Sequence, residues 1–576
     1  MPQCAPSLLF LLGILISGLL SGESLAASKP NIVLVTLDSA RADRMGFLGS
    51  RKGLTPNLDG IARQSIVFER AYAQAPLSVV SHATILSGTY PQTARASELG
   101  APIAAMLPYL PDLLRARGYR TAAFVGTIVL DPRSGLAPGF DRGFDVYDAG
   151  FRPPQRGEDR YRTVARHGDQ VVARAMKWLA SNTQRPFFLW VNLSDAGALY
   201  GTSYDQAVTA ADAAVGKLAG LLRAQKFYED AIIVVASDHG QSLGAHGEDT
   251  HGIFVYDETI HVPLVVKLPE KQMAGKRVSA RARLLDIAPT VLEEAGIPVP
   301  SQMQGQSLLR IAKTGADTDQ PAYARSDFPQ QGFGWSALES WRAGKYLYIR
   351  APKPELYDLS ADPSASHNLA ESSKATLETI ASQLEAFDNH FANGAGKSAD
   401  TGLTSSEAQK LASLGYVGLQ KSGAGVSRAA GGTDPKDTIA SANHVLSALL
   451  ELEDGKPEKA IPAFREALGT QVNIYLAQYG LGTALAQQQQ YSEAIEHLRK
   501  AIELQPESAW AHYEMGLSLM KTGDFKTAAI HLEIVAGRLP ESTSVHSVLA
   551  EVYDHLGRKQ DASRERTKVV ELAPKP

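Results

Sequence analysis

The stretch IIVVASDHGQSLGAHGEDTHG at residues 232–252 decides the fold of the first part of the chain. Its first six residues are apolar or small, and this short run predicts a buried strand. The run ends at Asp238, and His239 and a glycine-rich loop follow at once. In open α/β sheets, ligands bind at the carboxyl ends of the strands. The stretch therefore predicts a strand that delivers polar side chains to a functional site.

Similar short apolar runs surround this stretch. Four more of them predict buried strands at residues 31–37, 122–125, 187–193 and 263–268. Helical patterns lie between the runs, at residues 169–180 and 207–225, and Thr55 before Pro56 predicts a helix start. The alternation predicts an α/β domain over residues 29–392, with a mostly parallel sheet sandwiched by helices.

Three of the predicted strands end in an aspartate, namely Asp38, Asp195 and Asp238. Carboxylates gathered at one edge of a sheet repel each other unless a cation lies among them. The alternative for each aspartate alone is a helix cap or a turn residue. The three together with His239 favour a metal site.

Histidines in the loop after Asp238 refine this prediction. Imidazole ligands favour zinc or manganese, whereas calcium and magnesium prefer oxygen shells. We assign His251 to the metal site, expect His246 to be an exposed loop residue, and expect His261 to be structural. The expected cofactor is a divalent metal, with zinc or manganese favoured over calcium or magnesium.

The candidate nucleophile lies in APLSVVSHAT at residues 75–84. Ser78 precedes a predicted helix over residues 80–86, and the free N–H groups of a helix N-terminus favour an anionic ester. A neighbouring cation lowers the pKa of a serine hydroxyl and so makes it a better nucleophile. Ser81 and His82 are expected to contact the substrate oxyanion. The alternative is that Ser78 and Ser81 only cap the helix.

Composition excludes several functions. The chain has 576 residues, of which 44% are hydrophobic and 20% charged, so it is not a disordered chain. The net charge of −4 gives nucleic-acid binding no electrostatic support. Cys4 is the only cysteine, which excludes internal disulfides, cysteine-rich zinc modules and a cysteine nucleophile in the mature chain.

The N-terminus has the pattern of a targeting signal. An apolar run from Leu8 to Leu20 is followed by small residues at Ser24–Ala27, which predicts a signal peptide over residues 1–26. The rest of the chain is then extracytoplasmic, either periplasmic or secreted, and has no membrane span after cleavage. The alternative is an uncleaved N-terminal anchor.

The C-terminal part has a different organisation. Residues 393–437 are rich in Gly, Ser, Ala and Thr, which predicts a linker with one short helix near residues 405–414. Residues 438–576 repeat with a period of 34, the spacing of tetratricopeptide helix pairs. The repeat is carried by Gly482 and Gly516, by Ala460, Ala494, Ala528 and Ala562, and by Pro506, Pro540 and Pro574. Such all-α arrays form a concave face, which is expected to bind a protein or peptide, although a spacer role is the alternative.

The first part of the chain resembles the sulfatase-like branch of the alkaline phosphatase superfamily. The resemblance covers about residues 30–370 and is carried by the blocks NIVLVTLDSARADRMG, LTPNLDGIA, VFERAYAQAPLSVVSHATILSGTYP, IIVVASDHGQSLGAHGEDTHG and PELYDLSADPSASHNLA. It implies an alkaline phosphatase-like fold. It also implies that Asp38, Asp238 and His239 are metal ligands and that Ser78 is the nucleophile. Asp195 and His251 would then serve a second metal or the leaving group.

The chain also departs from the family pattern. Sulfatases that convert Cys or Ser to formylglycine have Pro two residues on and Arg four residues on, where this chain has Val80 and His82. We therefore expect an unmodified serine, which fits a phosphoester better than a sulfate ester. Ser39, Gly197 and the segment Gly126-Thr-Ile-Val stand where the family often has acidic, histidine and lysine residues.

These features predict a secreted hydrolase that acts on an anionic sulfate or phosphate ester. Ser78 attacks, a phosphoserine forms and water releases it, with His251 or His82 assisting the leaving oxygen. Two alternatives stay open. One is a transferase that moves a phospho-group onto an envelope glycan or lipid, and the other is a degenerate member that binds an anionic ligand while the repeats recruit a partner.

Overall fold

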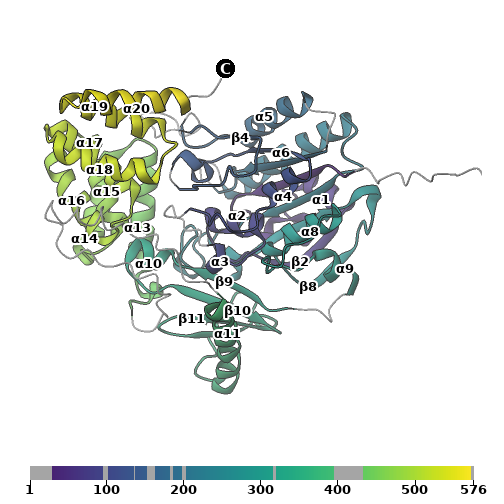
Figure 1. Ribbon diagram of the computed structural model, residues 1–576. Helices are drawn as coiled ribbons and strands as arrows, with labels where there is room; N and C mark the ends of the chain where they lie inside the picture. Colours follow the sequence, from purple (N-terminus) through teal and green to yellow (C-terminus); the bar gives the residue numbers. More distant parts are fainter. Residues whose placement is uncertain are drawn as a thin grey trace, which may run out of the picture.

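The structure is a computed structural model, drawn in Figure 1. It describes residues 29–94, 102–134, 136–151, 163–181, 186–197, 203–314, 320–394 and 432–572. The expected signal peptide, the expected short helix near residues 405–414 and most of the expected linker lie outside these residues. None of the described helices is both long enough and apolar enough to cross a membrane.

An eight-stranded sheet forms the centre of the first part of the chain. Its strand order is β4-β3-β5-β1-β6-β7-β2-β8, and every neighbouring pair is parallel except the two pairs that β7 makes. The strands are β1 (Ile32–Leu37), β2 (Ile66–Tyr72), β3 (Arg120–Phe124), β4 (Val146–Asp148), β5 (Phe187–Leu193), β6 (Ile232–Ser237), β7 (His261–Lys267) and β8 (Arg277–Arg283). The predicted mostly parallel sheet is confirmed, and β1 lies at its centre between β5 and β6.

Helices cover both faces of this sheet (Figure 1). Buried residues of one face pack against α1 (Pro56–Ala62), α5 (Gly168–Ala180) and α6 (Tyr204–Ala224). Those of the other face pack against α2 (Ser78–Ser87), α4 (Leu110–Ala116), α8 (Ile287–Glu294) and α9 (Leu308–Thr314). Strands buried on both faces are apolar at nearly every position, which is why the runs were visible in the sequence.

A smaller antiparallel sheet follows, in the order β12-β11-β10-β9. It consists of β9 (Ala322–Ser326), β10 (Leu338–Ala343), β11 (Tyr346–Arg350) and β12 (Glu355–Asp358), and it packs against α11 (Lys374–Gly394). The short helix α10 (Phe328–Phe333) connects β9 to β10. The sequence patterns above did not identify this sheet.

Helix α1 begins at Pro56 with Thr55 at the N-cap position, as expected, although the Thr55 side chain makes no capping hydrogen bond. The Thr55 hydroxyl instead donates to Asp59 Oδ1 at 3.1 Å and accepts the Gly46 N–H at 2.8 Å. The Thr55 side chain therefore ties the preceding loop to the helix.

Eight helices in antiparallel pairs form the C-terminal array. They are α13 (Pro435–Glu453), α14 (Pro457–Thr470), α15 (Tyr475–Gln487), α16 (Tyr491–Leu504), α17 (Ala509–Thr522), α18 (Phe525–Arg538), α19 (Thr543–His555) and α20 (Lys559–Leu572). A Cβ built on Gly482 would lie 2.7 Å from Leu498 Cγ, and one on Gly516 would lie 2.7 Å from Leu532 Cγ. The same close contact thus recurs 34 residues apart, as the repeat predicted.

The array packs against the first part of the chain (Figure 1). One hydrophobic cluster includes Leu77 and Phe328 of the first part and Ala442 and Leu476 of the array. Close to this cluster, Lys436 Nζ lies 2.6 Å from Glu355 Oε1. The two parts therefore share a core and are not separate bodies on a tether.

The repeated glycine contact predicts a difference between two Gly→Ala variants. Both Gly516→Ala and Gly537→Ala gain about 1 kcal/mol of helix propensity. A methyl group at 516 meets Leu532, whereas nothing lies within 4 Å of a Cβ at 537. We expect Gly516→Ala to be less stable than Gly537→Ala by about 1–3 kcal/mol, the usual cost of overpacking. Urea unfolding followed by circular dichroism measures the difference, and equal stabilities would contradict the contact.

Candidate active site

Two neighbouring parallel strands place the acidic residues of the site. Strands β1 and β6 pair with Leu37 opposite Ser237, so Asp38 and Asp238 leave the sheet side by side. The Ser237 hydroxyl donates to the Leu37 carbonyl at 2.7 Å and accepts the Ala40 N–H at 2.8 Å, which fixes the two strand ends together. The predicted placement of these carboxylates at one edge follows directly from this register.

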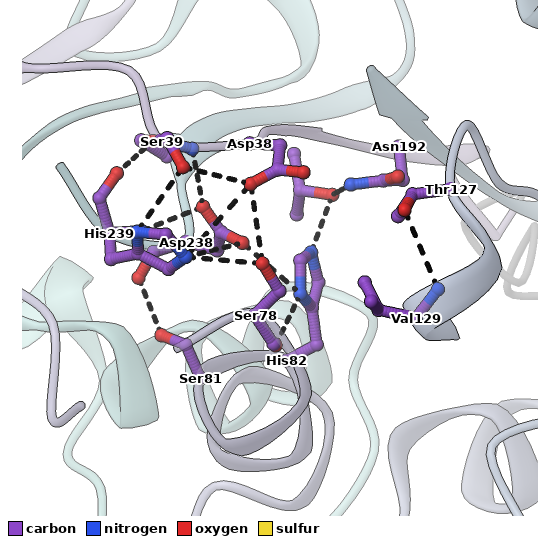
Figure 2. A network of polar contacts seen from close by, with 12 residues as sticks. Asp38, Ser39, Ser78, Ser81, His82, Thr127, Val129, Asn192, Asp238 and His239 are labelled. Atoms are coloured by element: carbon purple, nitrogen blue, oxygen red, sulfur yellow. Dashed lines mark hydrogen bonds and ion pairs between the residues drawn. The ribbon is translucent and has the colours of Figure 1, made fainter. Parts of the chain in front are cut away.

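Asp38, Asp238 and His239 form a buried cluster (Figure 2). Each offers one potential ligand atom, and these atoms all lie within 4.8 Å of one another. His239 Nε2 lies 3.6 Å from Asp238 Oδ2 and 3.9 Å from Asp38 Oδ1. The described residues therefore bring together two carboxylates and one imidazole around a common point.

The electrostatics of this cluster fit a cation. Burial, and next the charge of Asp238, raise the pKa of Asp38 well above its usual range. Asp238 Oδ1 accepts the N–H groups of Ser39 and His239, but Asp238 Oδ2 is buried and has no hydrogen-bond partner within the described chain. A buried carboxylate oxygen without a partner is costly, and a bound cation would satisfy it.

The imidazole of His239 is also oriented to bind a cation. Its Nδ1 lies 2.9 Å from the Gly240 carbonyl, which can only accept, so Nδ1 carries the proton. In the neutral ring Nε2 then has a lone pair, which it directs toward the carboxylates and Ser78. In metal-binding histidines, the ring nitrogen that does not bind the metal typically donates a hydrogen bond, and this bond fixes the tautomer.

Ser78 lies at this cluster. It is the first residue of α2, after the N-cap position Leu77, and only 4% of it is exposed. Its Oγ lies 3.1 Å from His239 Nε2 and 3.2 Å from Asp38 Oδ1 (Figure 2). The geometry thus brings Ser78 together with the three predicted metal ligands.

Ser39 belongs to the same network, although the sequence marked it only as a departure from the family pattern. Its backbone is left-handed, with φ of 57°, which turns its N–H toward Asp238 Oδ1 at 2.9 Å. Its hydroxyl donates to Asp38 Oδ1 at 3.1 Å. A serine after a strand-ending aspartate gives no pattern that would reveal this role.

The structure differs from the expectation that Ser81 and His82 contact the substrate. Both are fully buried. The Ser81 hydroxyl donates to the Asp238 carbonyl at 2.5 Å. His82 Nδ1 lies 2.7 Å from the Ser78 carbonyl and its Nε2 lies 2.9 Å from the Thr36 hydroxyl. Burial lowers the pKa of His82, so its ring is neutral. Both ring nitrogens are engaged within the protein, and the ring therefore connects α2 to β1.

Thr36 organises the layer beneath the site. Its hydroxyl oxygen accepts from Trp190 Nε1 at 3.0 Å and from Asn192 Nδ2 at 3.3 Å, and it lies 2.9 Å from His82 Nε2. One buried hydroxyl therefore connects β1, β5 and α2. Sequence reasoning missed Thr36 because a threonine inside an apolar strand looks like any β-branched strand residue.

Asp195 and His251 lie outside the three-residue cluster. Asp195 Oδ1 accepts the Gly168 N–H at 3.1 Å, Oδ2 has no hydrogen-bond partner among the described residues, and burial raises the pKa of this carboxyl. The His251 ring centroid lies 4.4 Å from that of His239, and its Nδ1 is 2.6 Å from Gln241 Oε1. Burial lowers the pKa of His251 well below its usual value, so the ring is neutral.

Gly197 stands where the family often has a histidine, and Thr127, next to Gly126, stands where it has a lysine. A Cβ built on Gly197 would lie 2.7 Å from Asp38 Cγ, so the backbone after β5 contacts this carboxylate. A Cβ on Gly126 would lie 2.8 Å from Ser194 Oγ. The hydroxyl of the next residue, Thr127, accepts the Val129 N–H at 3.5 Å at the start of the short helix η3 (Ile128–Leu130).

The other two histidines, His246 and His261, pack against tyrosines and lie outside the three-residue cluster. His246 is not the exposed residue we expected, because its ring stacks on Tyr256 with centroids 3.6 Å apart. His261 is structural, as expected, since Nε2 lies 2.9 Å from the Glu69 carbonyl and the ring packs on Tyr72. Glu248 is fully buried and accepts the Ile253 N–H at 2.7 Å, which holds the loop between His239 and His251.

Family models match both parts of the chain. The model described as Sulfatase matches residues 30–196, and that described as N-sulphoglucosamine sulphohydrolase, C-terminal, matches residues 247–389. Two tetratricopeptide repeat models match residues 476–523 and 513–564.

Curated relatives and solved structures agree with these matches. An ulvan-active sulfatase of Formosa agariphila is 26% identical, over 62% of this chain and 80% of its own length. An N-acetylgalactosamine-6-sulfatase of Canis lupus familiaris is 27% identical, over 53% of this chain and 70% of its own length. A phosphonate monoester hydrolase of Agrobacterium radiobacter shares the fold with a TM-score of 0.52 at 20% identity, over 63% of this chain and 96% of that one.

A third solved structure was determined in complex with its substrate D-glucosamine-2-N,6-O-disulfate. It superposes with a TM-score of 0.53 at 21% identity, over 64% of this chain and 99% of that one. The chain therefore carries a sulfatase-family hydrolase domain followed by tetratricopeptide repeats. Sulfatase-family proteins depend on a metal, typically calcium or magnesium, and the cluster described above is a possible site for one.

The central role of Thr36 predicts the cost of removing its hydroxyl. Thr36→Val keeps the shape but leaves three buried polar side chains without their shared partner, so we expect a loss of about 3 kcal/mol in the free energy of unfolding. Thr84→Val is the matched control, because that equally buried hydroxyl donates only to the Val80 carbonyl of its own helix. Chemical unfolding of both variants measures the difference, and an equal loss would show that Thr36 is not the centre of the network.

Proposed function

We propose that this protein is an extracytoplasmic, metal-dependent hydrolase that cleaves phosphate esters with an unmodified serine, Ser78, as the nucleophile. The observation that carries the proposal is the position of Ser78 Oγ, 3.1 Å from His239 Nε2 and 3.2 Å from Asp38 Oδ1. A hydroxyl at the N-terminus of α2 and beside a candidate metal cluster has the surroundings of an activated nucleophile.

The residues around Ser78 have defined roles in this proposal. Asp38, Asp238 and His239 would hold the divalent cation, which supplies a lowered hydroxyl pKa and stabilises charge on the ester oxygens. The donor set of two carboxylates and one imidazole suits zinc or manganese and also admits calcium or magnesium. Ser39 keeps both carboxylates in place through its N–H and its hydroxyl.

The reaction has two displacements at phosphorus. Ser78 Oγ forms a bond to phosphorus while the bond to the leaving alcohol breaks, and water then cleaves the phosphoserine. Asp38 Oδ1 is the acceptor within reach of the Ser78 proton, because the lone pair of His239 Nε2 would bind the cation. The leaving alkoxide takes its proton from water. His251 is better placed than His82 to hold that water, through its unprotonated Nε2, because both nitrogens of His82 are bonded within the protein.

The preference for phosphate over sulfate follows from the residues after Ser78. Val80 and His82 occupy the positions of the Pro and Arg that accompany formylglycine formation, and both are buried in the packing of α2. An ordinary serine forms a phosphoserine that water can hydrolyse. The extracytoplasmic location rests on the apolar run Leu8–Leu20 and the small residues Ser24–Ala27 that follow it.

Ser78→Ala tests the nucleophile. We expect turnover of 4-nitrophenyl phosphate and of bis(4-nitrophenyl) phosphate to fall at least about 10³-fold, because the attacking oxygen is gone. Ser87→Ala removes a hydroxyl at the other end of the same helix and should leave turnover near that of the wild type.

The same assay separates the alternatives. Mass spectrometry of the peptide that contains Ser78 should show serine and not formylglycine. A preference for 4-nitrophenyl sulfate, or a formylglycine mass, would contradict the phosphoester proposal. Absence of turnover with every ester and metal would favour the binding-protein alternative, and transfer to an added alcohol in place of water would favour the transferase.

Asp238→Asn tests the cation site. The variant keeps the volume but replaces a carboxylate oxygen by an amide, so we expect affinity for the divalent metal to fall at least about tenfold. Equilibrium dialysis against Mn²⁺, Zn²⁺, Ca²⁺ and Mg²⁺ measures this. Asp195→Asn is the comparison, because that carboxylate is also buried but lies outside the cluster. An equal loss in both variants would add Asp195 to the ligands, and unchanged affinity in Asp238→Asn would refute the site.

A further inference from the structure

The first helix of the repeat array contacts the glycine-rich loop that follows β6. On α13, Ile439 and Asn443 are four residues apart and so share one face of the helix. A Cβ built on Gly247 would lie 3.3 Å from Ile439 Cγ2. Asn443 Nδ2 donates to the Gly247 carbonyl at 2.8 Å, and Asn443 Oδ1 accepts the Asp249 N–H at 3.1 Å. These two hydrogen bonds, here called the Asn443 clamp, fix the backbone on both sides of Glu248.

Glu248 holds the same loop from the inside. It is fully buried, its Oε2 accepts the Ser242 hydroxyl at 2.8 Å, and its Oε1 accepts the Ile253 N–H at 2.7 Å. Ser242 precedes His251 in the chain and Ile253 follows it, so this carboxylate closes the loop that contains His251. The Asn443 clamp fixes the backbone from which the Glu248 side chain extends.

The backbone of the loop has a conformation that needs such support. Leu243 and His246 have φ of 55° and 53°, in the left-handed region that residues with a side chain adopt at a cost. Such residues persist where the surrounding contacts hold them in place. The clamp begins at Gly247, directly after His246, and therefore acts where the loop would otherwise relax.

The position of His251 depends on this loop. Its ring centroid lies 4.4 Å from that of His239, and its Nδ1 lies 2.6 Å from Gln241 Oε1. The carbonyl of the preceding residue, Thr250, accepts the Ser242 N–H at 2.7 Å. A shift of the loop backbone would therefore move His251 Nε2, which in the proposed function holds the water at the leaving oxygen.

We propose that Asn443 is a positioning residue of the hydrolase, which fixes residues 247–249 and thereby places His251 at the leaving group. The first unit of the repeat array then completes the active site of the same chain. This deepens the proposed function, and its effect on turnover rests on that function, whereas its effect on the loop does not.

The interface between the array and the hydrolase domain offers a matched control. Gln471, which follows α14, uses the same amide chemistry as Asn443. Its Oε1 accepts Trp335 Nε1 at 2.8 Å, and its Nε2 donates to the Phe333 carbonyl at 3.2 Å. Both partners lie at the end of α10 and not in the loop. Trp335 is only 2% exposed, so loss of the Gln471 amide disturbs the interface at least as much as loss of the Asn443 amide.

Hydrogen–deuterium exchange tests the clamp without requiring turnover. The full chain carries either Asn443→Leu or Gln471→Met, and each change removes one donor bond and one acceptor bond at similar side-chain volume. Asn443 is partly exposed, so the fold tolerates the change. We expect the amides of residues 247–254 to exchange at least about threefold faster in Asn443→Leu, because the Asp249 N–H loses its acceptor and the loop loses its support.

The control decides whether the effect is specific. Gln471→Met should leave exchange in residues 247–254 as it is in the wild type. Wild-type exchange in Asn443→Leu overturns the proposal, because the clamp then does not hold the loop. Equal acceleration in both variants also overturns it, because the array then acts only by docking.

A comparison of leaving groups connects the clamp to the reaction. Phenolate departs poorly without a proton, whereas 4-nitrophenolate departs readily without one, so a displaced His251 slows the first ester and spares the second. We expect Asn443→Leu to lower kcat/KM for phenyl phosphate at least about fivefold and to change that for 4-nitrophenyl phosphate less than about twofold. His251→Asn should give the same pattern, and Gln471→Met should change neither value.

A double variant shows whether Asn443 acts through His251. Asn443→Leu added to His251→Asn should cause no further loss with phenyl phosphate. A full further loss, or an equal loss with both esters in Asn443→Leu alone, overturns the positioning role while Ser78-dependent turnover still supports the proposed function. If the wild type turns over no ester, the proposed function fails, and the exchange result alone decides whether Asn443 holds the loop.

Discussion

The structure depends on two carboxylates that the central strands force together. The pairing of β1 with β6 leaves no register in which Asp38 and Asp238 avoid each other. Their charges are buried, so they must be neutralised by a proton, by hydrogen bonds or by a cation. Ser39, the N-terminus of α2 and the His239 ring all gather around them, and each reduces that cost. The position of Ser78 is one consequence of this arrangement.

Much of the fold could be predicted because the central strands are buried on both faces. Continuous apolar runs located β1, β5 and β6, and the aspartates after β1 and β6 located the candidate site. The antiparallel sheet β9–β12 could not be found in this way, because its strands are short and carry charged residues such as Arg325 and Glu339 that pair with one another in the folded chain.

The sequence predicted the side chains that the structure gathers into one cluster, but it did not predict the layer of residues beneath them. Asp38, Asp238, His239 and Ser78 follow from motif positions. The role of His82 did not, because a helix position does not say which face is buried, and in the structure that face meets the hydroxyl of Thr36. The 34-residue period predicted the helix pairs, but no local pattern could show that the array packs back on the hydrolase domain.

The shared hydrophobic cluster has a consequence for how this architecture can vary. Leu77, which precedes the candidate nucleophile, belongs to the same cluster as Leu476 of the second repeat unit. Damage to the packing of that unit would therefore reach the residue next to Ser78. The first repeat units pack on the sulfatase-family domain through a cluster that continues along the array as far as Ala562 of α20. A change in the number of units at the α20 end would shorten or extend this cluster but leave the contacts around Leu77 and Leu476 in place.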